Sequence, residues 1–134
     1  MSARILLIDT DSQFLLETRK HLSGHGYTVA TAVGGDEGLR RFRQFVPQLV
    51  IVEILMPDAD GIECLLEIKR ASPQTRVLAV SAGEGRLTSN FFLDVARKLG
   101  ADGVLKKPFT PEQLARAVQS VLSARRRRTG ARAG

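Results

Sequence analysis

Short runs of β-branched and aliphatic residues alternate along this chain with longer segments whose apolar residues recur at helical spacing. Consecutive parallel strands need a crossover connection, usually a helix. The alternation therefore predicts an α/β fold, a five-stranded parallel sheet with helices on both faces. Its strands are predicted at Arg4–Asp9, Thr28–Thr31, Leu49–Ile54, Arg76–Val80 and Gly103–Leu105. A chain of 134 residues is long enough for one such domain.

Start and stop signals bound the intervening helices. The last helix has the clearest ones, with Thr110 as N-cap, Pro111 at the first helical position and Gln113 three residues after the cap. Asp11 is expected to cap the first helix by accepting hydrogen bonds from backbone N–H groups. The helices are predicted from Asp11 to Gly24, from Asp36 to Phe45, from Gly61 to Arg70, from Thr88 or Ser89 onwards, and from Thr110 to about Ala124.

Apolar stripes indicate which side of each helix faces the sheet. The third helix is expected to point Ile62, Leu65 and Leu66 inward. Cys64, the single cysteine, can form no internal disulfide and is expected to be a small buried apolar residue. The stripe of the fourth helix is interpreted as core or interface rather than as an aromatic ligand site. It consists of Phe91, Phe92, Val95, Ala96 and Leu99.

The net charge of +6 is concentrated at the C-terminus. Residues 125–134 hold five of the 20 basic residues, and the other 15 nearly balance the 14 acidic ones. We therefore expect a domain over residues 1–124 and a disordered basic tail over 125–134, with nucleic-acid binding by the tail as the less favoured alternative. No apolar run is long enough to span a bilayer and no leader precedes the first strand, so a cytoplasmic protein without a membrane partner is expected.

Polar side chains stand where four of the predicted strands end. Asp9 ends the first strand, Glu53 lies near the end of the third, Ser81 follows the fourth and Lys107 follows the fifth. In open parallel sheets, functional groups gather at this edge. Two acids can hold a hard cation, a lysine can neutralise a phosphoryl group and a hydroxyl can donate to it. One such residue alone is more often a turn former or cap, but the four together favour phosphoryl chemistry.

The chain resembles the receiver domain of response regulators over residues 4 to about 124. The stretches that carry the resemblance are Arg4–Asp11, Gly26–Val29, Leu49–Glu63, Val80–Ala82 and Leu99–Phe109. The resemblance implies a flavodoxin-like (βα)5 fold with strand order 2-1-3-4-5 and a role in two-component or phosphorelay signalling. The family's active members carry two adjacent acids that hold Mg²⁺, and an aspartate that accepts a phosphoryl group from a histidine kinase.

This chain departs from that pattern at three positions. Asp9 matches the first acid, but the second position is Thr10, and Glu53 stands where the family has its phosphate-accepting aspartate. Ser81 and Lys107 match the family's switch hydroxyl and its lysine. The family's aromatic switch residue corresponds here to Val104, which has no ring to rotate.

These departures predict poor phosphorylation. Thr10 removes one charge and one oxygen ligand, so Mg²⁺ held by Asp9 and Glu53 is expected to bind weakly. The extra methylene of Glu53 displaces its carboxylate by about 1 Å, and a misplacement of that size can cost about a hundredfold in rate. Glu53 could instead pair with Lys107 and meet Ser81, as a phosphoryl group does, but with one negative charge against about two.

The preferred hypothesis is a stand-alone pseudo-receiver that acts by protein binding and is not an enzyme. Its partner would be a histidine kinase, an output protein or a second copy, met through the fourth helix, fifth strand and fifth helix, and exposure of Phe91 or Phe92 there would support this. The alternatives are a working phosphorelay receiver and a constitutively active phosphate mimic. A flavin or nucleotide is not expected, because the loop Asp9–Gln13 is acidic and lacks glycine.

Overall fold

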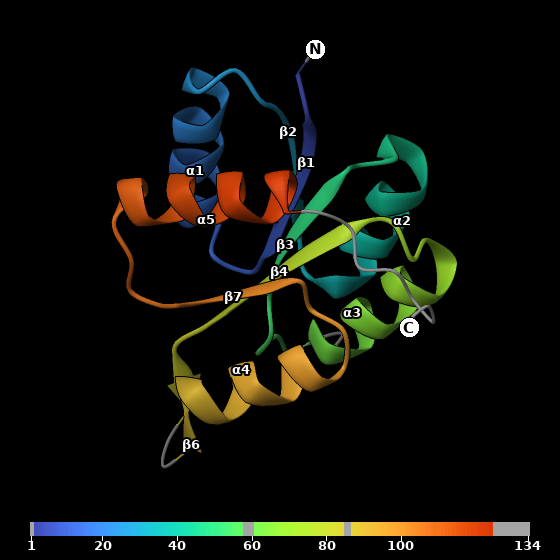
Figure 1. Ribbon diagram of the computed structural model, residues 1–134, viewed down its shortest axis with the longest axis vertical. Coiled ribbons are helices and arrows are strands. Elements are labelled where there is room, and N and C mark those ends of the chain that lie inside the picture. Colours follow the sequence, from blue (N-terminus) through green and yellow to red (C-terminus); the bar gives the residue numbers. More distant parts are fainter. Residues whose placement is uncertain (1, 58–60, 85–86, 125–134) are drawn as a thin grey trace.

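Five parallel strands form one sheet in the order β2-β1-β3-β4-β7 (Figure 1). The computed structural model describes residues 2–57, 61–84 and 87–124. The strands are β1 (Arg4–Asp9), β2 (Thr28–Val33), β3 (Leu49–Glu53), β4 (Arg76–Ser81) and β7 (Gly103–Lys106). In chain order these are the five predicted strands, so the predicted fold class and the strand order 2-1-3-4-5 are confirmed.

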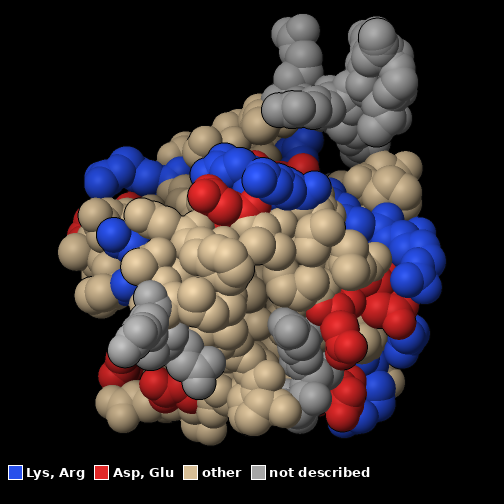
Figure 2. All heavy atoms as spheres, turned by 90° about the horizontal axis from the view of Figure 1, so that it is seen from below, with Lys and Arg blue, Asp and Glu red and all other residues tan. Residues whose placement is uncertain are grey.

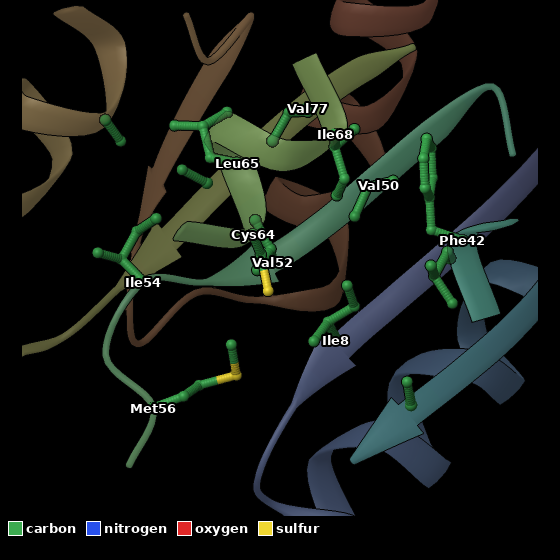
Figure 3. Close-up of a cluster of buried hydrophobic side chains, with 14 of the residues drawn as sticks. Ile8, Phe42, Val50, Val52, Ile54, Met56, Cys64, Leu65, Ile68 and Val77 are labelled. Carbon is green, nitrogen blue, oxygen red and sulfur yellow. The ribbon is translucent and has the colours of Figure 1, made fainter. Parts of the chain in front are cut away.

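Helices cover both faces of the sheet, two on one face and three on the other (Figure 1). They are α1 (Ser12–Gly24), α2 (Gly35–Phe45), α3 (Gly61–Ala71), α4 (Ser89–Lys98) and α5 (Pro111–Ser123). Successive strand residues point to opposite faces, so Leu6 and Ile8 of β1 pack under α2, α3 and α4 while Ile5 and Leu7 pack under α1 and α5. Figure 3 shows the first of these two clusters.

The predicted helix caps are present. The side chain of Asp11 accepts hydrogen bonds from the backbone N–H groups of Gln13 and Phe14, each at 3.1 Å. Thr110 and Gln113 form a reciprocal capping box at the start of α5. Both caps satisfy N–H groups that have no partner within the helix, and the cap of α1 fixes where the chain turns after Asp9.

Arg76, the first residue of β4, holds the opposite end of α5. Its guanidinium donates hydrogen bonds to the backbone carbonyls of Val121 and Leu122 through Nη1, and to that of Ala124 through Nη2 at 2.8 Å. The last carbonyls of a helix lack partners within it. Arg76 thereby fastens the C-terminal end of α5 to the edge of the sheet where the strands begin.

The structure corrects the predicted inward face of α3. Leu66 is 39% exposed, whereas Cys64, Leu65 and Ile68 are fully buried. A stripe that starts at Gly61 recurs at positions three, four and seven residues on, and Cys64 occupies one of them as the predicted small apolar residue. Leu66 lies five residues after Gly61, off this stripe, so the prediction that it points inward is wrong.

Several element boundaries also differ from the prediction. The strand β2 runs on to Val33, β4 includes Ser81 and β7 includes Lys106, while β3 stops at Glu53. A short antiparallel pair, β5 (Gly83–Glu84) and β6 (Leu87–Thr88), lies before α4 and was not predicted. No helix among the described residues is long and apolar enough to cross a membrane. The predicted basic tail, 125–134, lies outside the described residues.

Candidate functional site

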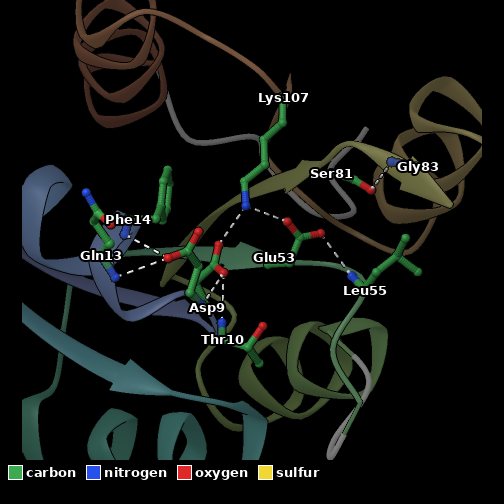
Figure 4. A network of polar contacts seen from close by, with 10 residues as sticks. Asp9, Thr10, Gln13, Phe14, Glu53, Leu55, Ser81, Gly83 and Lys107 are labelled. Carbon is green, nitrogen blue, oxygen red and sulfur yellow. Dashed lines mark hydrogen bonds and ion pairs between the residues drawn. The ribbon is translucent and has the colours of Figure 1, made fainter.

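Asp9, Glu53, Ser81 and Lys107 lie at one edge of the sheet, as the sequence predicts (Figure 4). The strands β1, β3 and β4 end on the first three, and Lys107 directly follows β7. Parallel strands end at the same edge, so residues up to 98 positions apart in the chain come within hydrogen-bond distance. This edge is where open α/β sheets place their functional groups.

Lys107 links the two carboxylates. Its Nζ lies 2.8 Å from Oδ2 of Asp9 and 2.8 Å from Oε1 of Glu53. The two acidic side chains are only 3% and 9% exposed and that of Lys107 is 21% exposed, so the ion pairs are largely shielded from water. One ammonium therefore serves two carboxylates, and this contact of Lys107 with Asp9 was not anticipated from the sequence.

The remaining carboxylate oxygens also have donors. Oδ1 of Asp9 accepts hydrogen bonds from the backbone N–H groups of Thr10 at 2.7 Å and Asp11 at 3.0 Å. Oε2 of Glu53 accepts from the backbone N–H of Leu55 at 3.0 Å. Thr10 is exposed and contributes its backbone rather than its hydroxyl. All four oxygens are thus engaged before any ligand arrives.

The surroundings of Lys107 keep it charged. Burial alone would lower the pKa of its ammonium, but hydrogen bonds with Asp9 and Glu53 and the attraction of their charges outweigh burial and raise that pKa above its ordinary value. The ring of Phe14 lies 4.5 Å from Nζ in a cation–π contact and packs edge-on against Phe109. Phe14 packs against the core beneath α1, and no sequence motif signals its contact with Lys107.

Ser81 and Val104 stand apart from this network. The buried hydroxyl of Ser81 accepts a hydrogen bond from the backbone N–H of Gly83 at 3.2 Å, in the unpredicted strand β5. Figure 4 shows Ser81 turned toward Gly83 and Glu53 turned toward Lys107, so within the described residues the contact expected between Glu53 and Ser81 is not made. Val104 is half-buried in β7 and packs against the core beneath α4.

The donor set does not fit a divalent cation as it stands. Mg²⁺ binds several oxygen ligands and prefers carboxylates, but Oδ2 of Asp9 and Oε1 of Glu53 are each occupied by the ammonium of Lys107. Across residues 2–57, 61–84 and 87–124, no three His, Cys, Asp or Glu side chains are grouped so as to hold a metal ion. A cation at this edge would compete with Lys107 for these two oxygens.

Comparison with known proteins assigns this chain to a family. The family model of the response regulator receiver domain matches residues 5–119. The chemotaxis protein CheY of Thermotoga maritima is 27% identical over 122 residues, which cover 90% of this chain and 98% of that protein. The probable transcriptional regulator ycf27 of Guillardia theta is 35% identical over 123 residues, which cover 89% of this chain and 45% of that protein. The chain thus spans about half the length of the transcriptional regulators it matches.

Solved structures agree. A receiver domain protein from Clostridium thermocellum is 34% identical with a TM-score of 0.78, covering 90% of this chain and 94% of that one. A CheY-like receiver domain protein from Methanospirillum hungatei JF-1 is 26% identical with a TM-score of 0.82, covering 91% and 94%. The chain therefore belongs to the response regulator receiver domain family, the signalling modules of two-component systems.

Proposed function

We propose that this receiver domain signals by binding a protein partner and is not efficiently phosphorylated. The observation that carries the proposal is the sharing of the Lys107 ammonium between Asp9 and Glu53, at 2.8 Å from each. In phosphoryl transfer, a lysine stabilises the charge of the transferred group. Here that positive charge is already neutralised by two carboxylates of the protein itself.

Glu53 also fills the space that a phosphoryl group would need and engages the hydrogen-bond donors that would contact it. One of its oxygens takes Lys107 and the other takes the backbone N–H of Leu55. Both contacts would have to break before a phosphoryl group could be accommodated. The additional methylene moves the carboxylate away from the position that in-line attack requires, and such reactions depend steeply on position.

Weak binding of Mg²⁺ follows from the same contacts. Both oxygens of Asp9 accept hydrogen bonds, and Thr10 at the second acidic position has a neutral, exposed side chain. Magnesium sheds its water ligands reluctantly and is held through carboxylates and phosphates. Because Thr10 replaces the second acid and Lys107 competes for Asp9 and Glu53, the site has few oxygen ligands that could replace the water bound to Mg²⁺.

The test is phosphorylation by a small-molecule donor. The native chain, incubated with acetyl phosphate and Mg²⁺ and read by intact mass, is expected to gain no phosphoryl group. The double variant Thr10→Asp/Glu53→Asp restores the second acid and the shorter acceptor, so we expect it to gain one, and Glu53→Asp alone to gain less. Addition of one phosphoryl group to the native chain would exclude the proposal.

A second candidate is a domain held permanently in the switched-on state. The pairing of Glu53 with Lys107 favours it, because a phosphoryl group would make the same contact. Two observations speak against it. The hydroxyl of Ser81 is hydrogen-bonded to Gly83 and not to Glu53. A carboxylate also carries one negative charge, against about two on a phosphoryl group. We therefore favour a fixed state that does not imitate phosphorylation.

The partner surface that we propose lies on α4. Phe91 is 49% exposed; Leu87, in β6 before the helix, and Leu99, directly after it, are 49% and 38% exposed. Phe92 is half-buried and supports Phe91 through an edge-on ring contact. Figure 2 looks onto the side of the molecule that holds α3 and α4. It shows an uncharged area bordered by charged side chains, with a band of Lys and Arg across the upper part of the view.

A second copy of this chain is the occupant that can be tested directly. Sedimentation velocity at increasing concentration is expected to show a dimer, and Phe91→Asp is expected to weaken it at least about tenfold, since exposed aromatic anchors dominate interfaces. Leu16→Asp is the matched control, because Leu16 is also 49% exposed but lies on α1. A native chain that stays monomeric throughout would assign this face to a different signalling protein.

A further inference from the structure

The fold separates the charged side chains of the domain between the two ends of the sheet. Residues 1–124 hold 15 Lys and Arg against 14 Asp and Glu, so by count this part of the chain is nearly neutral. Acids gather where the strands end, because they cap or open the helices that begin there. These acids are Asp11 of the α1 cap, Asp36 and Glu37 of α2, Glu63 of α3 and Glu112 of α5.

The opposite end of the sheet, where the strands begin, collects the ends of the helices. Arg4, the first residue of β1, donates a hydrogen bond at 3.1 Å to the backbone carbonyl of Phe45, the last residue of α2. Nζ of Lys69, in the last turn of α3, lies 2.7 Å from Oδ2 of Asp102, between α4 and β7. Arg76 holds the end of α5 in the same way. In Figure 1, α3, α4 and α5 run from left to right, so their last turns lie on one side.

Basic side chains dominate this end of the described chain. Seven of them lie in the last turns of α2, α3 and α4 or at the first residues of β1 and β4. They are Arg4, Arg43, Lys69, Arg70, Arg76, Arg97 and Lys98, and together they are called the basic end. In the last helical turns and the loops that lead from them into the strands, Asp102 is the only acid among the described residues, and Lys69 neutralises it.

Helix dipoles account for only part of this charge. A helix C-terminus carries about half a negative charge and favours nearby cations, so five helix ends offset about 2.5 positive charges. Asp102 offsets one more, and about half of the positive charge of the basic end stays unbalanced. Arg43, Arg97 and Lys98 are exposed, and within the described part of the chain they form no ion pair.

The sequence adds arginines next to the same end. Arg76 binds the backbone carbonyl of Ala124, and residues 125–128, which follow Ala124, are all arginine. By itself an arginine run is more often a solvated segment, which is why the sequence alone disfavours nucleic-acid binding. The basic end is a second and independent observation, because it arises from helices spread over the whole domain.

We propose that the basic end, aided by the arginines that follow Ala124 in the sequence, binds the phosphate backbone of double-stranded nucleic acid without reading its sequence. Guanidinium groups pair with phosphates through two hydrogen bonds, and most of these residues are arginines. An isoelectric point of about 10.2 with basic residues clustered on one side is the charge pattern of nucleic-acid binding. No described Phe or Tyr side chain is exposed at this end, so stacking on unpaired bases is not offered.

The test is titration of a fluorescent DNA duplex of mixed sequence with the full chain, followed by anisotropy. Complexes of this kind have Kd values of about 10⁻⁴ to 10⁻⁶ M at physiological salt, and we expect a value in this range. The logarithm of the affinity should fall linearly with the logarithm of the salt concentration, by about 0.9 for each phosphate contact. Single-stranded DNA of the same length should bind more weakly, because its charge density is lower.

A matched pair of variants locates the surface. Arg43→Gln/Arg97→Gln removes two exposed charges from the basic end, so at about 50 mM salt it should bind at least about tenfold more weakly, with a salt slope shallower by about 2. Lys106→Gln/Arg116→Gln removes the same charge from exposed residues at the end of β7 and in the first half of α5. This control should bind the duplex as the native chain does.

Four results would overturn the proposal. The first is no binding of the duplex by the native chain at about 50 mM salt, and the second is an equal loss in the two variants, which would make net charge alone responsible. The third is a loss seen only when residues 125–128 are replaced by glutamine. The fourth is salt-sensitive self-association in sedimentation velocity without duplex binding, which would pair the basic end with the acidic end of a second copy.

Discussion

Replacing Lys107 with methionine is expected to lower the free energy of unfolding by about 3 kcal/mol at pH 7, since removing one partner of a buried ion pair costs about 3–5 kcal/mol. Two carboxylates, those of Asp9 and Glu53, lose the same counter-charge in this variant. Lys107 is 21% exposed, so water screens part of the effect and the lower end of the range applies. Urea unfolding followed by circular dichroism measures the difference.

The pH dependence gives an independent check on the same residue. The pKa of Lys107 is raised in the folded chain, so as the pH rises the unfolded chain releases this proton first. The stabilisation is complete below the ordinary lysine pKa of about 10.4 and is lost as the pH rises through the folded value. Above about pH 10 the native chain should therefore lose stability more steeply than Lys107→Met.

The matched control is Lys106→Met. Lys106 is the neighbouring residue, carries the same charge and is exposed. It should keep the native stability at pH 7 and the native alkaline profile. If Lys107→Met unfolds at the same urea concentration as the native chain, the shared ion pair does not stabilise the fold.

A single methyl group at residue 61 is expected to destabilise the fold by about 3 kcal/mol or more, the upper end of what overpacking usually costs. A Cβ at Gly61 would lie 2.2 Å from the carbonyl oxygen of Glu53 and 2.5 Å from Cα of Ile54. Both are backbone atoms at the end of β3, so no side chain can swing aside to make room. Gly61→Ala should therefore push α3 away from the strand that carries Glu53.

Gly24→Ala is the control for this substitution. Gly24 is the last residue of α1, and a Cβ there would meet no heavy atom within 4 Å. Alanine is a better helix former than glycine, so the variant should equal the native chain or exceed it by about 0.5 kcal/mol. Urea midpoints of the two variants test the close approach at residue 61, and equal midpoints would contradict it.

The sheet could be predicted from the sequence because its three central strands, β1, β3 and β4, are buried on both faces and read as apolar runs. Its order came from the resemblance carried by Arg4–Asp11 and Leu49–Glu63. The caps Asp11 and Thr110 were predictable because a cap is a local interaction over three residues. The pair β5 and β6 was missed because strands of two residues each show no period.

The site could be predicted as a set of residues but not as a network. The sequence placed Asp9, Glu53 and Lys107 at one edge, since strand ends converge in any parallel sheet. It did not show that one ammonium contacts both acids, because that depends on side-chain reach across three strands. The aromatic support of Lys107 by Phe14 depends on where α1 packs, and no short motif encodes it.

The anchoring of α5 by Arg76 affects how a conformational change at the strand ends can reach the end of α5. Arg76 begins β4, so the last turn of α5 is tied to the edge of the sheet where strands start. Ser81 ends the same strand, and six residues of strand span about 20 Å. Ala124 therefore lies at the end of the domain remote from Lys107. A conformational change that starts at Asp9 and Glu53 would have to pass along the whole length of the sheet before it reached the last turn of α5.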